Sequence, residues 1–481
     1  MPTKRQESFD LVLAGTGFAS SFFLLKYREK YPNARVLVLE QGNHDTHEWK
    51  VENRKLMDPS GVVSSIDFRT TFINETPPKD WIYTPGLGGS SNCWWACTPR
   101  FLPSDLKLKS TYGIGSDWPL TYDELEPYYG EAERIMLISG DSERSPFRRS
   151  TPYPQRAHRF NNVDKLILKE YPDNFYCMPS ARPRAFSDKR AKCCASSVCN
   201  LCPIDAKFTV LNELAHLYFD SATKLELSSQ AISLDIENNT AKQIRYLQAG
   251  REKTARAEIF ALGCNPIFNS QILLASSINN PLIGRGISEQ MTVSCDVLLD
   301  GVKNFDGSSA LTGHGYMFYD GEHRRSRAAC LLQTQNIPKI RLQRGKYTER
   351  ATFKFLFEDL PQADNFVKLS DEVGKPSVHF ANYSTYAIQS LAHIKSIFEK
   401  AFSSLPIESY NFSEPLPTDG HILGTAPMGE NLETSVVDRQ QLIHGIRNVF
   451  VLGGSSFSSV PPPNPTLTIC ALSLWSADRG L

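Results

Sequence analysis

The hydrophobic pattern of the first forty residues predicts a strand, a helix and a second strand. Residues 9–14 and 35–40 are short apolar runs with the length of buried strands. Between them a mixed apolar and polar stretch extends to Tyr31 and is stopped by Pro32, which cannot continue a helix. This order of elements predicts a βαβ unit built on a parallel sheet.

The pattern changes in the second half of the chain. Over much of residues 294–410, apolar and polar positions alternate, for example in residues 351–358, which predicts antiparallel strands with one wet face. Residues 383–402 have the pattern of a helix. Two further apolar runs, at 257–262 and 449–452, predict buried strands. The fold class expected is α/β, or α+β for the chain as a whole.

Small residues at fixed spacing mark the turn of the βαβ unit. Gly15 permits a tight turn, and Gly17 lets the backbone approach a pyrophosphate at the helix start. Glu40 follows Gly17 by 23 positions, which suits a carboxylate that binds a ribose. Ser20 replaces the usual third Gly or Ala. In this context the motif predicts a bound dinucleotide, without separating FAD from NAD; a βαβ unit without a nucleotide is the alternative.

Composition narrows the class of protein. Lys plus Arg and Asp plus Glu are equal at 52 each, so the charge gives no argument for nucleic acid or for an anionic membrane. No apolar run reaches the roughly 20 residues of a transmembrane span. The chain enters its first strand by Phe9, and we find no signal peptide before it. We therefore expect a cytoplasmic globular protein that has no transmembrane segment and binds no nucleic acid.

The last 64 residues hold two candidates for acid–base chemistry. His421 lies in a polar turn that leads to glycine, and a neutral histidine can take a proton from an alcohol. Asn464 lies in a proline run before an apolar helix, and its amide can hold the same oxygen. A hydride acceptor would have to be a cofactor. Both residues have a purely structural alternative. His421 could form hydrogen bonds with backbone groups of its turn, and Asn464 could be the N-cap of the following helix, with Pro465 as the first helical residue.

Four of the eleven cysteines cluster within ten positions. They are Cys193, Cys194, Cys199 and Cys202. Thiolates are soft ligands that select iron–sulfur clusters or zinc. A four-thiolate zinc site, a disulfide and free thiols are the alternatives to an iron–sulfur cluster, and the spacing alone leaves all of them open.

Together, several motifs in order along the chain resemble one family. They are the N-terminal fingerprint, the glycine–serine loop at 88–91, the run at 113–129, and the tail that contains His421 and residues 464–468. They resemble the glucose–methanol–choline (GMC) flavoprotein oxidoreductases, and specifically their sugar and polyol dehydrogenase branch. The resemblance covers most of the chain except roughly residues 300–410.

The resemblance implies a bound FAD, with His421 as the base and Asn464 as its partner. It implies two domains. The first is a Rossmann-like FAD-binding domain, discontinuous in sequence, at 1–110, 190–295 and 415–481; the second is a substrate or cap domain with an antiparallel sheet and helices at 111–189 and 296–414. The cofactor-binding residues implied are Gly15, Gly17, Phe18, Ala19, Glu40, Gln41, Gly88, Gly89, Ser90, Ser91, Trp94, Ala96, Ala231, Gly263, Gly454, Ser455, Pro465 and Thr466.

The cysteine segment resembles that of three-component sugar dehydrogenases, whose flavin subunit carries a 3Fe–4S cluster. This resemblance implies that Cys193, Cys194 and Cys199 are the cluster ligands and that Cys202 is not a ligand. The activity implied is oxidation of a sugar, polyol or glycoside hydroxyl to a carbonyl by hydride transfer to flavin N5. The electrons would then pass through the cluster to a cytochrome c or another external acceptor.

Alternatives to this activity and to its location remain open. An oxygen-dependent GMC oxidase with structural cysteines is one alternative activity, and a non-catalytic flavoprotein subunit is another. A small partner subunit is implied as well, and export together with such a subunit would make the location periplasmic.

Overall fold

The computed structural model describes residues 7–481, and its first sheet contains the βαβ unit predicted from the sequence. Its strands follow the order β7-β2-β1-β10-β9-β8, with β18 beside β10. The inner strands are parallel, whereas β8 and β9 form an antiparallel hairpin next to β10. The strands are β1 (Ser8–Ala14), β2 (Val36–Leu39), β7 (Thr223–Glu226), β8 (Ser229–Glu237), β9 (Thr240–Gln248), β10 (Arg251–Leu262) and β18 (Val449–Val451).

Four helices share a hydrophobic core with this sheet, whose central strands are buried on both faces. They are α1 (Phe18–Lys30), α5 (Tyr122–Ile135), α8 (Pro266–Ala275) and α10 (Thr466–Arg479). Helix α10 packs against α1 and α5, and these helices share one hydrophobic core with the sheet. Helix α5 belongs to this core although it falls within residues 111–189, which we had assigned to the substrate domain.

The second sheet has six antiparallel strands in the order β17-β11-β14-β13-β12-β6. Helix α9 (Thr385–Ala401) covers one face, and its apolar side shares a second core with β11, β13 and β14. The alternating pattern therefore gave the correct element type. The strands are β6 (Phe175–Cys177), β11 (Met291–Leu299), β12 (Leu311–Phe318), β13 (Cys330–Gln335), β14 (Arg350–Phe357) and β17 (Ile407–Phe412).

Smaller elements connect the two sheets. Two short sheets combine β3 (Ile73–Asn74) with β15 (Phe366–Lys368) and β16 (Ser377–His379), and β4 (Ser139–Gly140) with β5 (Gln155–Arg156). The short α-helices are α2 (His47–Glu52), α3 (Pro103–Leu106), α4 (Leu108–Tyr112), α6 (Asn162–Glu170) and α7 (Val210–Glu213). The 3₁₀ turns are η1 (Arg54–Leu56), η2 (Phe68–Thr70), η3 (Gly89–Asn92), η4 (Ala215–Leu217), η5 (Glu322–Arg325) and η6 (Gly453–Ser456).

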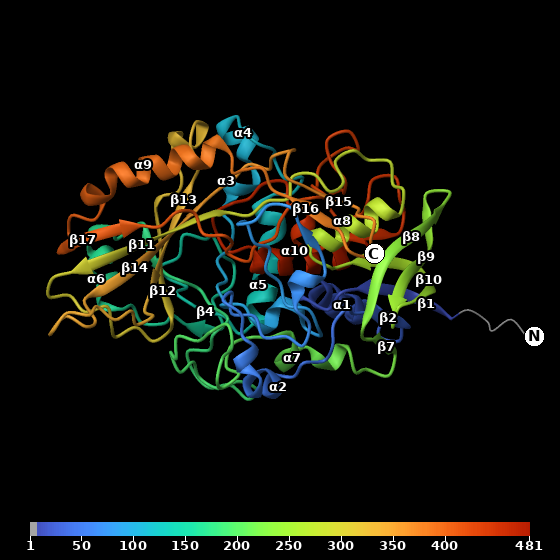
Figure 1. Ribbon diagram of the computed structural model, residues 1–481, viewed down its shortest axis with the longest axis horizontal. Coiled ribbons are helices and arrows are strands. Elements are labelled where there is room, and N and C mark those ends of the chain that lie inside the picture. Colours follow the sequence, from blue (N-terminus) through green and yellow to red (C-terminus); the bar gives the residue numbers. More distant parts are fainter. Residues whose placement is uncertain (1–6) are drawn as a thin grey trace, which may run out of the picture.

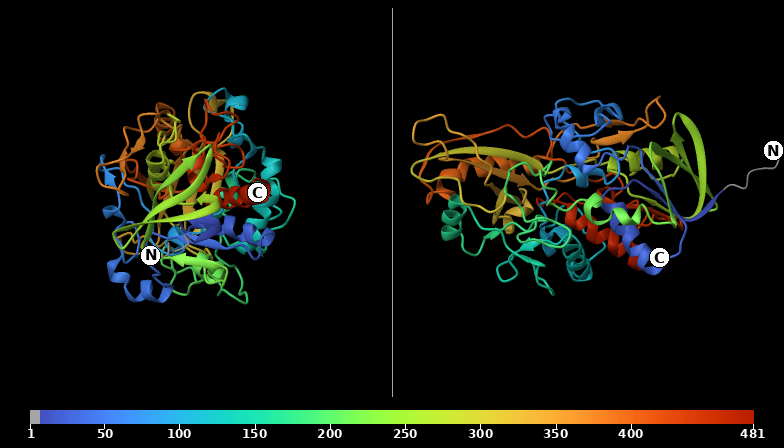
Figure 2. Two further views of the ribbon diagram at one scale, coloured as in Figure 1. Left: turned by 90° about the vertical axis from the view of Figure 1, so that its right-hand side faces the viewer. Right: turned by 90° about the horizontal axis from the view of Figure 1, so that it is seen from below.

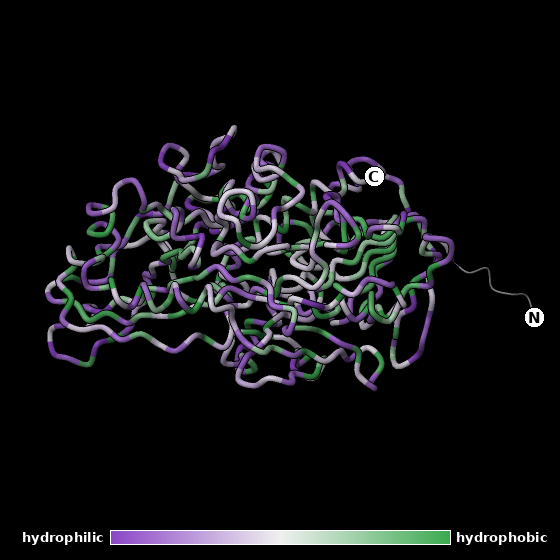
Figure 3. The backbone as a smooth tube through the Cα atoms, turned by 90° about the horizontal axis from the view of Figure 1, so that it is seen from above, coloured by the Kyte–Doolittle hydropathy of each residue, from purple (hydrophilic) through white to green (hydrophobic). Residues whose placement is uncertain are grey.

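The two large sheets lie at opposite ends of an elongated molecule, as Figure 1 and the right-hand view of Figure 2 both show. Hydrophobic segments run through the interior, and polar segments are concentrated in the peripheral loops (Figure 3). Within residues 7–481, no helix combines the length and the hydropathy that a membrane crossing requires. The mixed α/β fold class predicted from the sequence is confirmed.

Candidate active site

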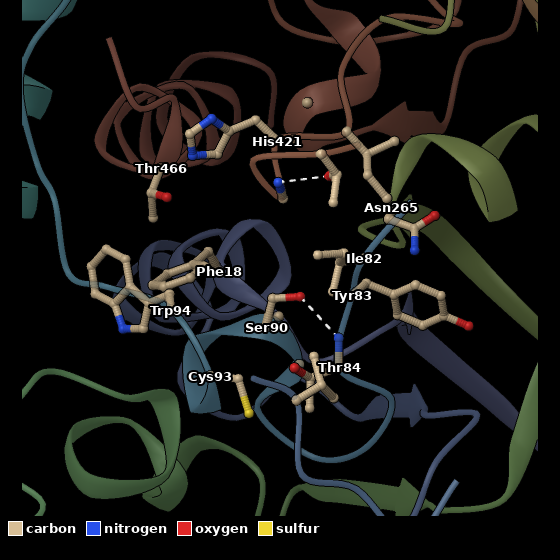
Figure 4. Close-up of a pocket in the computed structure, with 18 of the residues that line it drawn as sticks. Phe18, Ile82, Tyr83, Thr84, Ser90, Cys93, Trp94, Asn265, His421 and Thr466 are labelled. Carbon is tan, nitrogen blue, oxygen red and sulfur yellow. Dashed lines mark hydrogen bonds between the residues drawn. The ribbon is translucent and has the colours of Figure 1, made fainter. Parts of the chain in front are cut away.

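A cavity of about 730 Å³ lies between the two large sheets and is lined by residues from both sides of the molecule. One part of its wall comes from the turn between β1 and α1, from η3 and from the start of α10. The other part comes from the second sheet, through Leu311, Gln333 and Lys354. Figure 4 shows side chains from distant parts of the sequence, among them Phe18, Trp94, His421 and Thr466, around one open space.

The turn between β1 and α1 is built for close backbone approach. Gly15 has φ +87°, and a Cβ there would lie 2.9 Å from the carbonyl oxygen of Gly263. Ser20 is accommodated because Gly263 opposite has no side chain, and its Oγ lies 3.3 Å from the Gly263 carbonyl oxygen. Gly17 has nothing within 4 Å of the position where a Cβ would stand. The turn therefore leaves open space in front of a helix N-terminus, as a pyrophosphate requires.

Gly17 gives a direct test of this cradle. Its φ of −74° is accessible to any residue, so a Gly17→Val variant adds bulk without backbone strain. We expect a folded protein whose affinity for flavin falls roughly tenfold or more, because the side chain fills the pyrophosphate path. Flavin absorbance per mole of purified protein measures the loss, and an unchanged far-ultraviolet circular dichroism spectrum shows that the fold is kept. Full flavin occupancy in the variant would contradict this placement.

Glu40, the predicted ribose ligand, lines the cavity and also forms hydrogen bonds within the protein. Its carboxylate accepts hydrogen bonds from Thr16 Oγ1 at 2.6 Å, from the Gly42 amide at 2.9 Å and from the Gly86 amide at 3.2 Å. A carboxylate has about four acceptor positions, so a further donor can still be bound. Glu40 thus also holds the neighbouring loops around the cavity.

Most residues implied for cofactor binding line the cavity. They are Gly15, Gly17, Phe18, Ala19, Glu40, Gln41, Gly89, Ser90, Trp94, Ala231, Gly263, Gly454, Pro465 and Thr466. Four others, Gly88, Ser91, Ala96 and Ser455, do not line it. Instead they support the wall: for example, Ser91 Oγ donates to the Gly88 carbonyl oxygen at 2.6 Å, and Ser455 Oγ accepts from Asn269 Nδ2 at 2.9 Å. The hydroxyl groups of Ser91 and Ser455 therefore hold the loops behind the cavity.

The structure brings the two acid–base candidates together on the wall of this cavity. His421 Nε2 lies 3.3 Å from Asn464 Nδ2, and His421 Nδ1 lies 3.0 Å from Gln290 Oε1. The predicted helix cap is wrong by one residue, because α10 begins at Thr466 with Pro465 in the cap position and no side-chain cap. Asn464 therefore does not cap the helix, and its amide nitrogen is directed toward the imidazole of His421.

A buried ion pair holds the loop that carries His421. Glu289, whose side chain is fully buried, pairs with Lys79 and accepts hydrogen bonds from the backbone N–H groups of Asp419 and His421 at 2.7 and 2.9 Å. It also accepts from Thr418 Oγ1 at 2.9 Å. Sequence reasoning missed Glu289 and its neighbour Gln290, because neither belongs to a recognisable motif. The signal available was two adjacent polar residues directly before an apolar strand.

Burial lowers the pKa of His421 below its ordinary value of 6.5, while the nearby carboxylates of Asp419 and Glu289 oppose the shift. Lys354 and Lys79 lower this pKa further. Asp419 Oδ2 lies 3.9 Å from His421 Nδ1, and its other oxygen forms an ion pair with Lys354. The imidazole is consequently neutral at neutral pH, which is the form that accepts a proton.

A Lys354→Met variant is expected to shift the pH dependence of flavin reduction. Loss of the cation leaves Asp419 unpaired beside the imidazole, so the pKa of His421 rises. Because only neutral His421 accepts a proton, the acidic limb of the profile moves to higher pH. Stopped-flow reduction under anaerobic conditions across pH 5–9 measures it, with Lys368→Met, on the small sheet with β3, as control. A limb that stays in place would refute this electrostatic coupling.

The cysteine segment does not form a metal centre in the structure. Within residues 7–481, no group of three or more His, Cys, Asp or Glu side chains is placed to hold a metal ion. Cys194 is exposed, Cys193 is partly buried, and Cys199 and Cys202 are buried. All eleven cysteines are free thiols, so the disulfide alternative is wrong here. The predicted ligand set Cys193, Cys194 and Cys199 is thus not gathered around one point.

Two buried cations flank this segment. Arg182 is 2% exposed and donates to Cys199 Sγ at 3.6 Å and to the Trp95 carbonyl oxygen at 2.7 Å. Lys207 is 2% exposed and donates to three backbone carbonyl oxygens. Burial lowers the pKa of Lys207 to about 8, an effect that the neighbouring thiols oppose. Within the described residues no salt bridge joins either cation to a carboxylate, and Lys207 donates to carbonyl oxygens while Arg182 donates to Cys199 Sγ.

The fold and the cavity define the class of protein. A glycine-rich dinucleotide cradle shares one cavity with a buried, neutral histidine and an asparagine, which is the site of an oxidoreductase that uses a dinucleotide cofactor. Residues 361–473 match the family model described as GMC oxidoreductase. The predicted resemblance and the enzyme class are therefore confirmed, and they support FAD as the cofactor.

Individual proteins agree with this assignment. The chain is 26% identical to the fructose dehydrogenase large subunit of Gluconobacter japonicus, with 98% of each chain covered. It is 26% identical to 6'''-hydroxyparomomycin C oxidase of Streptomyces lividus over 81% of this chain and 78% of the relative. Its fold is similar to that of pyridoxine 4-oxidase from Mesorbium loti, with a TM-score of 0.68, 14% identity and 98% of each chain covered.

Proposed function

We propose that the protein oxidises a hydroxyl of a sugar, polyol or glycoside to a carbonyl with FAD as hydride acceptor. The observation that carries the proposal is the pair formed by His421 Nε2 and Asn464 Nδ2, 3.3 Å apart on the wall of the cavity that the glycine-rich turn also lines. A base and a cofactor cradle in one cavity are the two parts that alcohol oxidation needs.

Each residue of the site has one role in the proposed reaction. His421 Nε2 takes the hydroxyl proton of the substrate as the carbon–oxygen double bond forms. Asn464 holds the same oxygen through its amide. Bound FAD supplies the acceptor for the hydride that leaves the carbon. Glu289 fixes the loop of His421 through its backbone, so the base is held in place before substrate arrives.

The substrate class is supported by the cavity wall and by the relatives. Trp95, Gln333, Gln335 and Lys354 line the cavity on the side of the second sheet. An indole face with amide and ammonium groups suits a polyhydroxylated ring, which offers apolar C–H faces and many hydroxyls. The names of the Gluconobacter and Streptomyces relatives, a fructose dehydrogenase subunit and an aminoglycoside oxidase, agree with such a substrate.

For the exit of electrons we propose an external acceptor rather than oxygen, in a partner subunit or a cytochrome c. The name of the Gluconobacter relative, a large subunit, supports a multi-subunit arrangement. A 3Fe–4S cluster at Cys193, Cys194 and Cys199 remains a prediction from the sequence. The contact of the buried Arg182 guanidinium with Cys199 Sγ supports an anionic group there, whereas the placement of the thiols does not.

The proposal is tested on protein purified without oxygen. Flavin bleaching is followed with a panel of sugars, polyols and simple alcohols, and turnover is then compared with oxygen and with an artificial acceptor. Iron and sulfide are assayed in the same sample. Flavin that a sugar or polyol reduces supports the proposal, and flavin that no alcohol reduces would favour a non-catalytic subunit. Hydrogen peroxide formed at the rate of turnover, without iron, would favour the oxidase.

A further inference from the structure

Gln290 lies directly behind the imidazole of His421. Its side chain is 1% exposed and belongs to the segment just before β11. Gln290 Oε1 lies 3.0 Å from His421 Nδ1. Its amide nitrogen donates to two backbone carbonyl oxygens, those of Pro461 at 2.8 Å and of Pro463 at 3.2 Å. The amide therefore has partners on both sides, and it links the loop of His421 to the proline run before Asn464.

These partners determine which way the amide faces. A backbone carbonyl can only accept a hydrogen bond, so the group that faces Pro461 and Pro463 is the NH₂ group. The oxygen of Gln290 then faces His421, and an amide oxygen can only accept. His421 must consequently carry its proton on Nδ1. In the neutral ring this leaves a lone pair on Nε2, the nitrogen that lies 3.3 Å from Asn464 Nδ2.

We propose that Gln290 is a positioning residue that fixes the tautomer of His421. This rests on the proposed role of His421 as the base. Without an acceptor at Nδ1 the neutral ring can carry its proton on Nε2, and that form has no lone pair directed toward Asn464 and cannot take a proton there. The carboxylate oxygen of Asp419 is farther from Nδ1, at 3.9 Å, and Asp419 is already paired with Lys354. Gln290 is thus the closer acceptor for Nδ1–H.

The test uses the full-length, FAD-loaded protein and three variants. Gln290→Met keeps the length of the side chain but removes the acceptor. Gln290→Glu keeps an acceptor oxygen toward Nδ1 but loses the NH₂ group that faces Pro461 and Pro463, so it tests the role of the acceptor alone. Ser288→Ala is the matched control, because it removes a buried hydrogen bond to the Gly286 carbonyl oxygen in the same segment without touching His421. Two-bond ¹H–¹⁵N spectra of labelled imidazoles distinguish the tautomers, with His421→Asn to identify the signal.

In the wild type, Ser288→Ala and Gln290→Glu proteins we expect the Nδ1-protonated pattern. In Gln290→Met we expect the Nε2-protonated pattern to appear and flavin reduction to slow by roughly 10²-fold, with FAD content unchanged. An unchanged imidazole pattern in Gln290→Met would overturn the proposal, whether or not the rate falls, because a slower rate alone would then reflect packing. The spectra report the tautomer independently of activity. If the protein oxidises no alcohol, the spectra still show whether Gln290 fixes the tautomer, so the two proposals can fail separately.

Discussion

A His421→Ala variant is expected to reduce its flavin about 10² to 10⁴ times more slowly than the wild type at neutral pH while FAD stays bound. The substrate hydroxyl loses the group that takes its proton, and Asn464 has no lone pair on its amide nitrogen to replace it. The glycine-rich turn that is predicted to bind FAD is formed by other segments, so cofactor content should be retained. Single-turnover reduction by the best substrate, followed at the flavin absorption band, measures the effect.

His444→Ala is the matched control for this experiment. His444 lies in the same C-terminal region and has a hydrogen-bond partner of its own, Ser435 Oγ at 2.9 Å from Nε2, but it does not line the cavity. We expect its reduction rate to stay near that of the wild type. An equal loss in both variants would mean that the His421 effect is one of stability, and an unchanged His421→Ala rate would remove this residue from the reaction.

A Glu289→Met variant is expected to lose about 3–5 kcal/mol of stability. The carboxylate is the ion-pair partner of buried Lys79, so its removal leaves an uncompensated charge in the interior. It also removes the acceptor for the backbone N–H groups of Asp419 and His421, which frees the loop that carries the base. Urea unfolding of the FAD-loaded protein measures the loss, and flavin reduction should slow as the loop becomes mobile.

The double variant Lys79→Met and Glu289→Met separates the two roles of this carboxylate. Replacing both members of a buried ion pair by apolar residues of similar volume is often close to neutral. We therefore expect most of the stability to return, whereas the loop still lacks its acceptor and flavin reduction stays slow. Recovery of the full rate in the double variant would show that the carboxylate acts on the loop only through the charge of Lys79.

The elements of the fold were predictable from the sequence because local patterns determine them. The apolar runs at 9–14 and 35–40, the glycine turn between them, and the alternating residues of the second half each specify an element through burial. The boundary at Asn464 was less predictable. An asparagine before a proline favours a helix cap, but here the interaction with His421 takes the amide and the helix begins one residue later.

The supporting groups of the site were not predictable because long-range packing brings them together. Glu289 and Gln290 lie about 130 positions from His421 in the sequence, and neither belongs to a motif. The same holds for Arg182, whose contact with Cys199 connects the cysteine segment with Trp95 in the cavity wall. Cysteine spacing indicated a ligand set, but spacing does not determine whether thiols converge, and here they do not.

The position of β18 in the first sheet has a consequence for synthesis of the chain on the ribosome. Residues 260–262 at the end of β10 pair with β18, which follows roughly 190 residues later. At a translation rate of about 5–20 residues per second, this apolar strand edge waits for its partner for roughly 10–40 s. An unpaired edge of this kind is a template for association between nascent chains. We therefore expect this short edge to be exposed to such association until β18 has been synthesised.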